Sequence, residues 1–120
     1  MATYAAWRRV HLTASTVLCL LAVAHVALTI PIYRAWNPDA VWFMGAGLGL
    51  LLLGLLNWAH IGIEPCTMPT TRLVRWANWA FVIFGIGALV AVPEPQAMVI
   101  VGALVAQAVA AHRTLPGPAA

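Results

Sequence analysis

Residues 40–63 read AVWFMGAGLGLLLLGLLNWAHIGI, a run of 24 residues without a charged side chain. Three further uncharged runs lie at residues 10–33, 76–93 and 95–112. A helix needs roughly 20 apolar residues to cross a hydrocarbon core about 30 Å thick. Because backbone polar groups must pair with one another in lipid, long non-alternating apolar runs of this kind form helices. The sequence therefore predicts an all-α protein with four membrane spans, at about residues 10–31, 40–61, 74–92 and 96–112.

The composition of the whole chain agrees with this prediction. Of its 120 residues, 63% are hydrophobic and 8% are charged, whereas a soluble domain carries about 25% charged residues. We therefore expect residues 1–120 to form one integral membrane domain. The formal net charge of +3 comes from arginines at the span ends, so the expected partner is the lipid bilayer and not a nucleic acid.

Six arginines and no lysine set the expected orientation. Four spans in an up-down bundle place Arg34 on one side of the membrane and the other five arginines on the opposite side. Basic residues in short loops favour the cytoplasmic side. We therefore predict a four-helix bundle in the inner membrane with both termini in the cytoplasm. The five arginines on that side are Arg8, Arg9, Arg72, Arg75 and Arg113.

Small residues recur at four-residue spacing within the spans. Gly45 and Gly49 form such a pair in the second span, and Gly102 and Ala106 form another in the fourth. Gly87 lies in the third span. Helices associate in lipid by close backbone approach at small residues. These positions are predicted to be helix-packing sites within the chain, in a homo-oligomer or in a larger membrane complex.

The first half of the chain carries a family resemblance. Residues 25–29 (HVALT), 42–49 (WFMGAGLG) and 55–57 (LLN), together with Tyr33 and Trp36, resemble small bacterial four-helix integral membrane proteins without assigned activity. The resemblance implies a bacterial membrane protein of four helices. It implies no catalytic residues.

Several polar residues fall within the spans, where they are costly and therefore informative. Counting from the arginines at about 1.5 Å per residue places His11 and His112 in one layer near the inner face. The same layer is predicted to hold Asn57, His60, Asn78 and Gln107. We expect this layer to join helices or to bind a lipid headgroup.

The histidines also suggest a cofactor. His11 and His25 are fourteen residues apart in the first span, and Met98 and His112 are fourteen apart in the fourth. In antiparallel neighbouring helices, this spacing puts His11 level with His112 and His25 level with Met98. Histidine pairs and histidine–methionine pairs are axial ligands of haem iron. The pattern is similar to that of membrane b-type cytochromes, which makes binding of haem b one hypothesis.

Three functions follow from these patterns. The first is a non-enzymatic accessory or interaction subunit of a membrane assembly, and the second is a b-type haem protein that transfers electrons. The third is a quinone or lipid site lined by His25, Trp42 and Asn57. Enzyme chemistry is not favoured, because no carboxylate lies within a span and Ser15 is the single serine. The sequence predicts no metal site.

Overall fold

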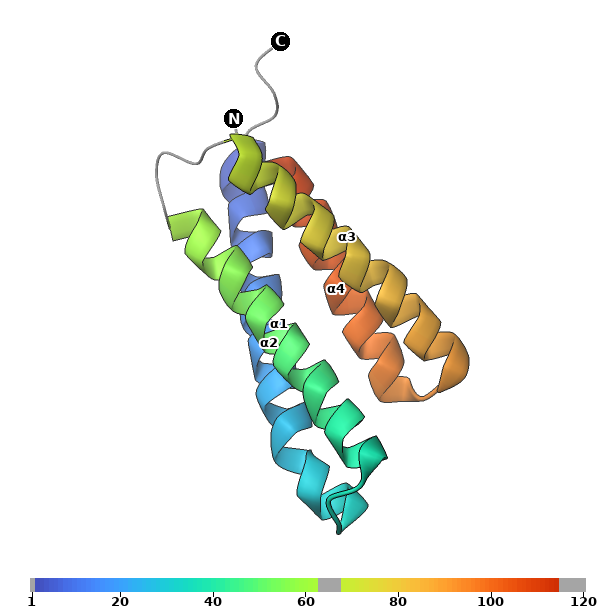
Figure 1. Cartoon of the computed structure of the whole chain (residues 1–120). Helices are drawn as coiled ribbons and strands as arrows, with labels where there is room; N and C mark the ends of the chain where they lie inside the picture. The colour runs from blue at the N-terminus through green and yellow to red at the C-terminus, as the bar shows by residue number, and fades with distance from the viewer. Residues whose placement is uncertain (1, 63–67, 115–120) are drawn as a thin grey trace.

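The computed structural model describes residues 2–62 and 68–114, which form four α-helices. Figure 1 shows α1 (Ala2–Tyr33), α2 (Pro38–Gly62), α3 (Met68–Ala91) and α4 (Pro95–Thr114). All four are long and apolar enough to cross a membrane. The predictions of an all-α fold and of four helices that suit a bilayer are confirmed.

The helices do not end where the spans were predicted to end. α1 begins eight residues before its predicted span and continues through Pro31 to Tyr33. α2 and α4 extend past both predicted ends, and α3 begins six residues early. A helix continues into the interface because its backbone hydrogen bonds do not depend on lipid. The span boundaries themselves therefore stay a prediction.

Capping by local side chains fixes the start of α2. The side-chain oxygen Oδ1 of Asn37 accepts a hydrogen bond of 2.8 Å from the backbone N–H of Ala40. Asparagine is among the best residues at this capping position, and Pro38 follows at the first helical position, where its missing N–H leaves no bond unmade. Asp39 lies in the first turn, where its charge complements the helix dipole.

Arg34, the first residue after α1, has an unusual backbone conformation. Its φ angle is 55°, and its backbone N–H donates to the carbonyl of Ile30 at 2.8 Å. This left-handed conformation is typical of glycine after a helix and is unfavourable for other residues. The chain therefore turns from α1 toward α2 through a strained position.

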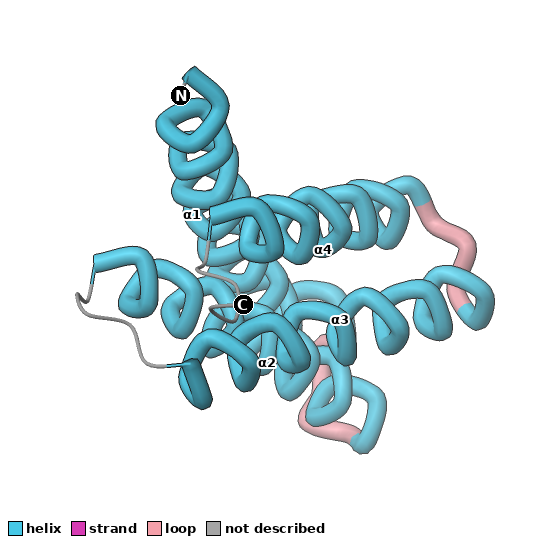
Figure 2. Tube along the Cα trace, turned by 90° about the horizontal axis from the view of Figure 1, so that it is seen from above, coloured by secondary structure: helices cyan, strands magenta, loops and turns pink. Residues whose placement is uncertain are grey.

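The helices associate as two pairs. α1 packs along α2 and also contacts α4, and α3 packs along α4, whereas α2 and α3 touch sparsely. Figure 1 shows the α1–α2 pair and the α3–α4 pair close together at the end where α1 begins, and separated at the opposite end. Figure 2, seen from above, shows the same divergence of the two pairs. The long axis of the molecule is 52 Å, which exceeds the 40–45 Å of a bilayer with its headgroups.

One apolar cluster forms the core between the pairs. Leu18 of α1, Leu53 of α2, Val82 of α3 and Leu104 of α4 are each at most 4% exposed and belong to it. Close packing here requires a glycine, because a Cβ at Gly54 would lie 2.6 Å from the Cys19 sulfur and 3.1 Å from the Ser15 carbonyl oxygen. The α1–α2 contact is therefore close enough to exclude even a methyl group.

The glycines predicted to mark helix contacts differ in their surroundings. A Cβ at Gly49 would lie 3.2 Å from the Phe81 ring, so this glycine does face a neighbouring helix. At Gly45, Gly87 and Gly102, a Cβ would meet nothing within 4 Å. These three positions face outward, so no helix that the structure describes packs against them, and their use in a homo-oligomer or a larger complex stays a prediction. Ala106 is also exposed and lines a surface groove.

Other glycines hold the internal contacts instead. A Cβ at Gly47 would lie 2.9 Å from the Val26 side chain, and one at Gly85 would lie 2.9 Å from the Leu104 side chain. Gly47 is two residues from Gly45, which corresponds to a rotation of about 200° around the helix. Of the glycine pair predicted in α2, Gly49 faces α3 and Gly45 faces outward.

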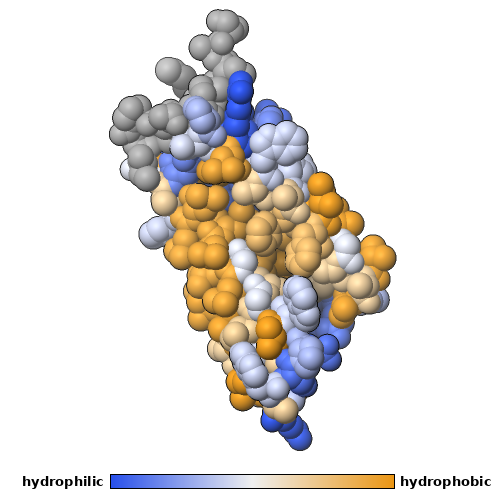
Figure 3. All heavy atoms as spheres, in the orientation of Figure 1, coloured by the Kyte–Doolittle hydropathy of each residue, from blue (hydrophilic) through white to orange (hydrophobic). Residues whose placement is uncertain are grey.

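The outer surface is largely apolar. Figure 3 shows a broad hydrophobic band on one face, with hydrophilic residues toward the two ends. Large side chains project from it, including Trp42 and Val90, each 79% exposed, and Trp76 at 75%. Soluble monomers rarely expose apolar patches of this extent. The surface suits a lipid environment.

Candidate functional site

A hydrogen-bonded set of buried side chains joins all four helices near the end where α1 begins and α4 ends. Each member is at most 6% exposed. We call this set the polar network. Its members are His11 and Ser15 of α1, Asn57 of α2, Asn78 of α3, and Gln107 and Thr114 of α4.

Two asparagines form the centre of the polar network. Nδ2 of Asn78 donates to Oδ1 of Asn57 at 2.9 Å, and Nδ2 of Asn57 donates to Oδ1 of Asn78 at 3.1 Å. Each amide nitrogen also donates at 2.9 Å to a carbonyl four residues earlier in its own helix, Leu53 or Val74. All four amide hydrogens are therefore used, and these carbonyls fix which end of each amide faces its partner.

That orientation also fixes the role of one ring nitrogen of His11. Oδ1 of Asn57 is an acceptor and lies 2.9 Å from Nε2 of His11, so Nε2 must carry the hydrogen and donate it. Nδ1 of His11 lies 2.7 Å from the hydroxyl oxygen of Thr114. Both ring nitrogens of His11 are thus bonded within the protein.

Two hydroxyl groups link α1 to α4 on either side of this histidine. The Ser15 hydroxyl donates to the backbone carbonyl of His11 at 2.8 Å and accepts from Nε2 of Gln107 at 2.9 Å. The Thr114 hydroxyl donates to the carbonyl of Ala110 at 2.8 Å, and its oxygen thereby connects the last turn of α4 to the imidazole of α1.

The chemistry of the polar network suits helix association. Its side chains are buried and hydrogen bond to one another, so few of their donors and acceptors remain for a substrate. An unpaired polar group in a low-dielectric interior costs about 1–3 kcal/mol, and a connected network fixes which side chains must meet. The polar network therefore sets both the rotation and the axial position of four helices at one level.

Further contacts lie close to the polar network. Nε2 of His60 lies 3.3 Å from the hydroxyl of Thr71, which joins α2 to α3. A guanidinium nitrogen of Arg75 donates to the backbone carbonyl of His112 at 3.3 Å. A cation at the last turn of a helix is favourable because the carbonyl ends carry partial negative charge. This end of the molecule is thus tied together by α2–α3 and α3–α4 contacts as well.

The structure brings Asn57, Asn78 and Gln107 of the predicted polar layer into the polar network, and it places His60 in the neighbouring contact with Thr71. The depth of this layer in a membrane stays a prediction. His11 joins the layer, but the side chain of His112 is exposed.

The expected haem-ligand pairs do not form. His11 meets Thr114 of α4, with His112 on another face of that helix. The predicted axial level of the contact was close, since positions 112 and 114 differ by about 3 Å along the axis of α4. Their side chains nevertheless point in different directions, because two residues turn a helix by about 200°. Met98 is 57% exposed, and His25 contacts an aromatic ring of α2. Neither proposed pair faces each other in this arrangement.

His25 belongs to an aromatic cluster at the other end of the α1–α2 pair. Its ring stacks on Phe43 with centroids 3.6 Å apart and planes 17° apart, and Tyr33 meets the same Phe43 edge-on at 5.5 Å. The proposed quinone site is not assembled here, because Trp42 projects outward and Asn57 lies about 21 Å along α2 from Phe43. The cluster packs two helices together.

Sequence reasoning missed the hydroxyl members of the site. Ser15 lies four residues after His11 and so shares its helix face, which was a usable signal. Thr71 and Thr114 lie outside the predicted spans, and that placement hid them. A hydroxyl group near the end of a span can hydrogen bond to water at little cost. A serine or threonine at such a position therefore does not by itself indicate a helix contact.

Among residues 2–62 and 68–114, no group of three or more histidine, cysteine or acidic side chains is placed to hold a metal ion. Comparisons with protein-family models, with curated proteins and with solved structures found no match to the chain. The fold defines the class of protein, an all-α protein whose four helices suit a membrane.

Proposed function

We propose that the four helices cross the bacterial inner membrane as an up-down bundle, with both ends of the chain in the cytoplasm. The exposed apolar side chains and the 52 Å length support this arrangement. The choice of the bacterial inner membrane rests on the resemblance of the first half of the chain to small bacterial membrane proteins.

The positions of the arginines support the orientation. The guanidinium of Arg113 lies 5.6 Å from the ring centre of Trp7, and Arg75 bonds to the carbonyl of His112. These contacts gather the ends of α1, α3 and α4 that carry five of the six arginines. Arg34 follows the opposite end of α1. The positive-inside rule favours the cytoplasm for the arginine-rich end.

Reporter fusions test the orientation. A green fluorescent protein fused after residue 120 should fluoresce, and alkaline phosphatase at the same position should be inactive. A phosphatase inserted between Trp36 and Asn37 should be active. The opposite pattern at both positions would overturn the proposed orientation.

We further propose that this protein is a non-enzymatic interaction subunit of a membrane assembly, either of its own copies or with other membrane proteins. The observation that carries the proposal is the set of outward glycines, Gly45, Gly87 and Gly102, at which an added Cβ would meet nothing. Glycine in a helix interior costs about 1 kcal/mol relative to alanine. Within residues 2–62 and 68–114, no neighbouring helix comes within 4 Å of the place that a Cβ would take at these glycines.

A helix of another protein molecule could approach closely at these glycines, because they carry no side chain. Helix association in lipid depends on van der Waals packing at small residues, which let two backbones approach. The polar network supports the same proposal from the inside, because its donors and acceptors are engaged between the protein's own helices. The outer surface is left as the region where a partner binds.

Mass measurement in mild detergent tests the interaction role. We expect the wild-type protein to run as a homo-oligomer or with a co-purified membrane protein. Gly87→Leu and Gly102→Leu should release the monomer, and Ala80→Leu, at another small exposed position of α3, should leave the assembly intact. A wild-type protein that is strictly monomeric without any partner would contradict the proposal.

A further inference from the structure

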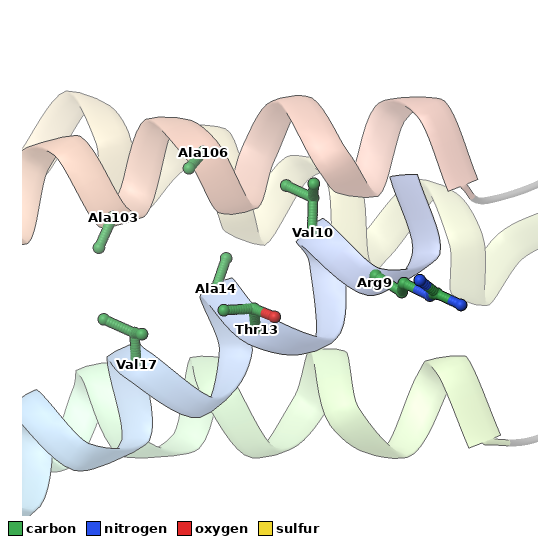
Figure 4. Close-up of a pocket in the computed structure, with 7 residues that line it drawn as sticks. All are labelled: Arg9, Val10, Thr13, Ala14, Val17, Ala103 and Ala106. Atoms are coloured by element: carbon green, nitrogen blue, oxygen red, sulfur yellow. The ribbon is translucent and has the colours of Figure 1, made fainter. Parts of the chain in front are cut away.

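A shallow groove of about 380 Å³ runs between α1 and α4 on the outer surface. Figure 4 shows side chains from both helices along it. Those that matter here are Arg9, Thr13, Ala14 and Val17 of α1, and Ala103 and Ala106 of α4.

The lining of the groove is almost entirely apolar, and the Arg9 side chain extends from one end of it toward the start of α1, away from the alanines (Figure 4). Figure 4 places Arg9 at the end nearer the start of α1, with Val17 and Ala103 at the far end. Eight residues separate Arg9 from Val17, which is about 12 Å along the helix axis. The Thr13 hydroxyl lies between them. An apolar chain that fills this groove would therefore bring a head group at its end to the level of Arg9.

Small residues leave the groove open, and a buried hydrogen bond joins the two helices at the same level. Ala14, Ala103 and Ala106 leave space that larger side chains would fill. At the same level, the buried Ser15–Gln107 hydrogen bond of 2.9 Å joins α1 to α4. The groove is therefore a depression on a closed helix contact, and a chain lying in it remains on the lipid-facing surface.

We propose that this groove binds an anionic phospholipid, with one acyl chain along the alanines and the phosphate held by Arg9. A guanidinium pairs with a phosphate through two parallel hydrogen bonds. Arg9 belongs to the arginine-rich end of the molecule, which attracts anionic lipids. A partner helix fits less well, because a membrane span seldom offers an anion for Arg9. The inference rests on the proposed membrane location, and because Gly102 lies about one turn from Ala106 on α4, the oligomeric mass is measured beside lipid retention.

Native mass spectrometry after extraction from vesicles tests the proposal, with phosphatidylglycerol and phosphatidylcholine present in equal amounts. The wild-type protein should retain phosphatidylglycerol preferentially. Arg9→Gln should lower phosphatidylglycerol retention roughly fivefold, the effect of one basic residue at the membrane surface, and leave phosphatidylcholine unchanged. Ala106→Leu, which fills the groove, should lower the retention of both lipids.

Two control variants test whether the loss of lipid is specific to the groove. Arg34→Gln removes an arginine from the opposite end, and Ala80→Leu enlarges an exposed alanine outside the groove; both should retain lipid like the wild type. Equal retention of the two lipids by the wild type would overturn the proposal. So would an equal loss in Arg34→Gln, or a co-purified helix that cross-links at position 106. Circular dichroism checks folding, and an unchanged oligomeric mass separates failure here from failure of the interaction role.

Discussion

At the end of the molecule where α1 begins, buried side chains from all four helices hydrogen bond to one another. At the opposite end, α1 and α2 meet through an aromatic cluster around His25 and Phe43, and the α3–α4 pair lies apart (Figure 1). Both regions are built mainly from apolar helices. They differ in whether polar side chains connect one helix pair to the other.

The difference has a physical explanation in the proposed environment. In water, two apolar helix faces associate because their contact removes them from solvent. In lipid this driving force is missing, and helices stay together through hydrogen bonds and close packing at small residues. Where neither hydrogen bonds nor close packing join two helix pairs, the pairs can separate. The α1–α2 and α3–α4 pairs are apart at the end opposite the polar network, which we call the open end; the end with the polar network is the closed end (Figure 1). The comparison predicts which substitutions weaken the molecule.

The largest loss of stability is expected at the contact between α1 and α2, which extends through both regions. Gly54→Val places new atoms against the Cys19 sulfur and the Ser15 carbonyl, so it should destabilise the monomer by about 3 kcal/mol, at the upper end of the usual overpacking range. Gly87→Val, where space is open, is the matched control and should change monomer stability far less. Unfolding of the monomeric protein in mixed detergent measures both. Equal losses would show that the α1–α2 packing is looser than described.

A somewhat smaller effect is expected within the polar network. Asn57→Leu leaves the Nε2–H of His11 and one amide hydrogen of Asn78 without their acceptor, which should cost about 2 kcal/mol. Asn57→Leu combined with Asn78→Leu should cost less than the sum of the single variants, because the second change removes a group already left unpaired. Additive losses in this double-mutant cycle would mean that the two amides do not pair.

A smaller gain is expected in the loop of the open end. Arg34→Gly should stabilise the protein by about 1 kcal/mol, because glycine adopts φ 55° without the penalty of a side chain. Arg34→Gln keeps that penalty and should have no such effect. The comparison of the two thermal midpoints isolates the backbone contribution. A gain of equal size in both variants would assign it to the lost charge instead.

The sequence predicted the helices well because their cause is local. Long uncharged runs admit one solution in lipid, and residues 40–62 lie within α2. Axial level was also predictable, since each residue adds about 1.5 Å: His11 was expected beside His112 and lies beside Thr114. Both quantities follow from counting along the chain.

The rotation of each helix was not predictable in the same way. His112 and Thr114 differ by about 200° around α4, as do Gly45 and Gly47 around α2. Nearly every face of these helices is apolar, so the pattern of apolar and polar residues does not mark an inner face as it does in soluble helices. Rotation is set by tertiary contacts such as the Asn57–Asn78 pair, which become visible once the helices are assembled.

Distances between spin labels test most directly whether the polar network holds the two helix pairs together. Labels at positions 8 and 72 report on α1 and α3 at the closed end, and labels at positions 32 and 90 report on the open end, with both native cysteines replaced by alanine. In lipid nanodiscs, the closed-end pair should give a narrow distance distribution and the open-end pair a broader one. Asn57→Leu should broaden the closed-end distribution. Equal widths at the two ends, or a closed end that stays narrow in Asn57→Leu, would contradict the account.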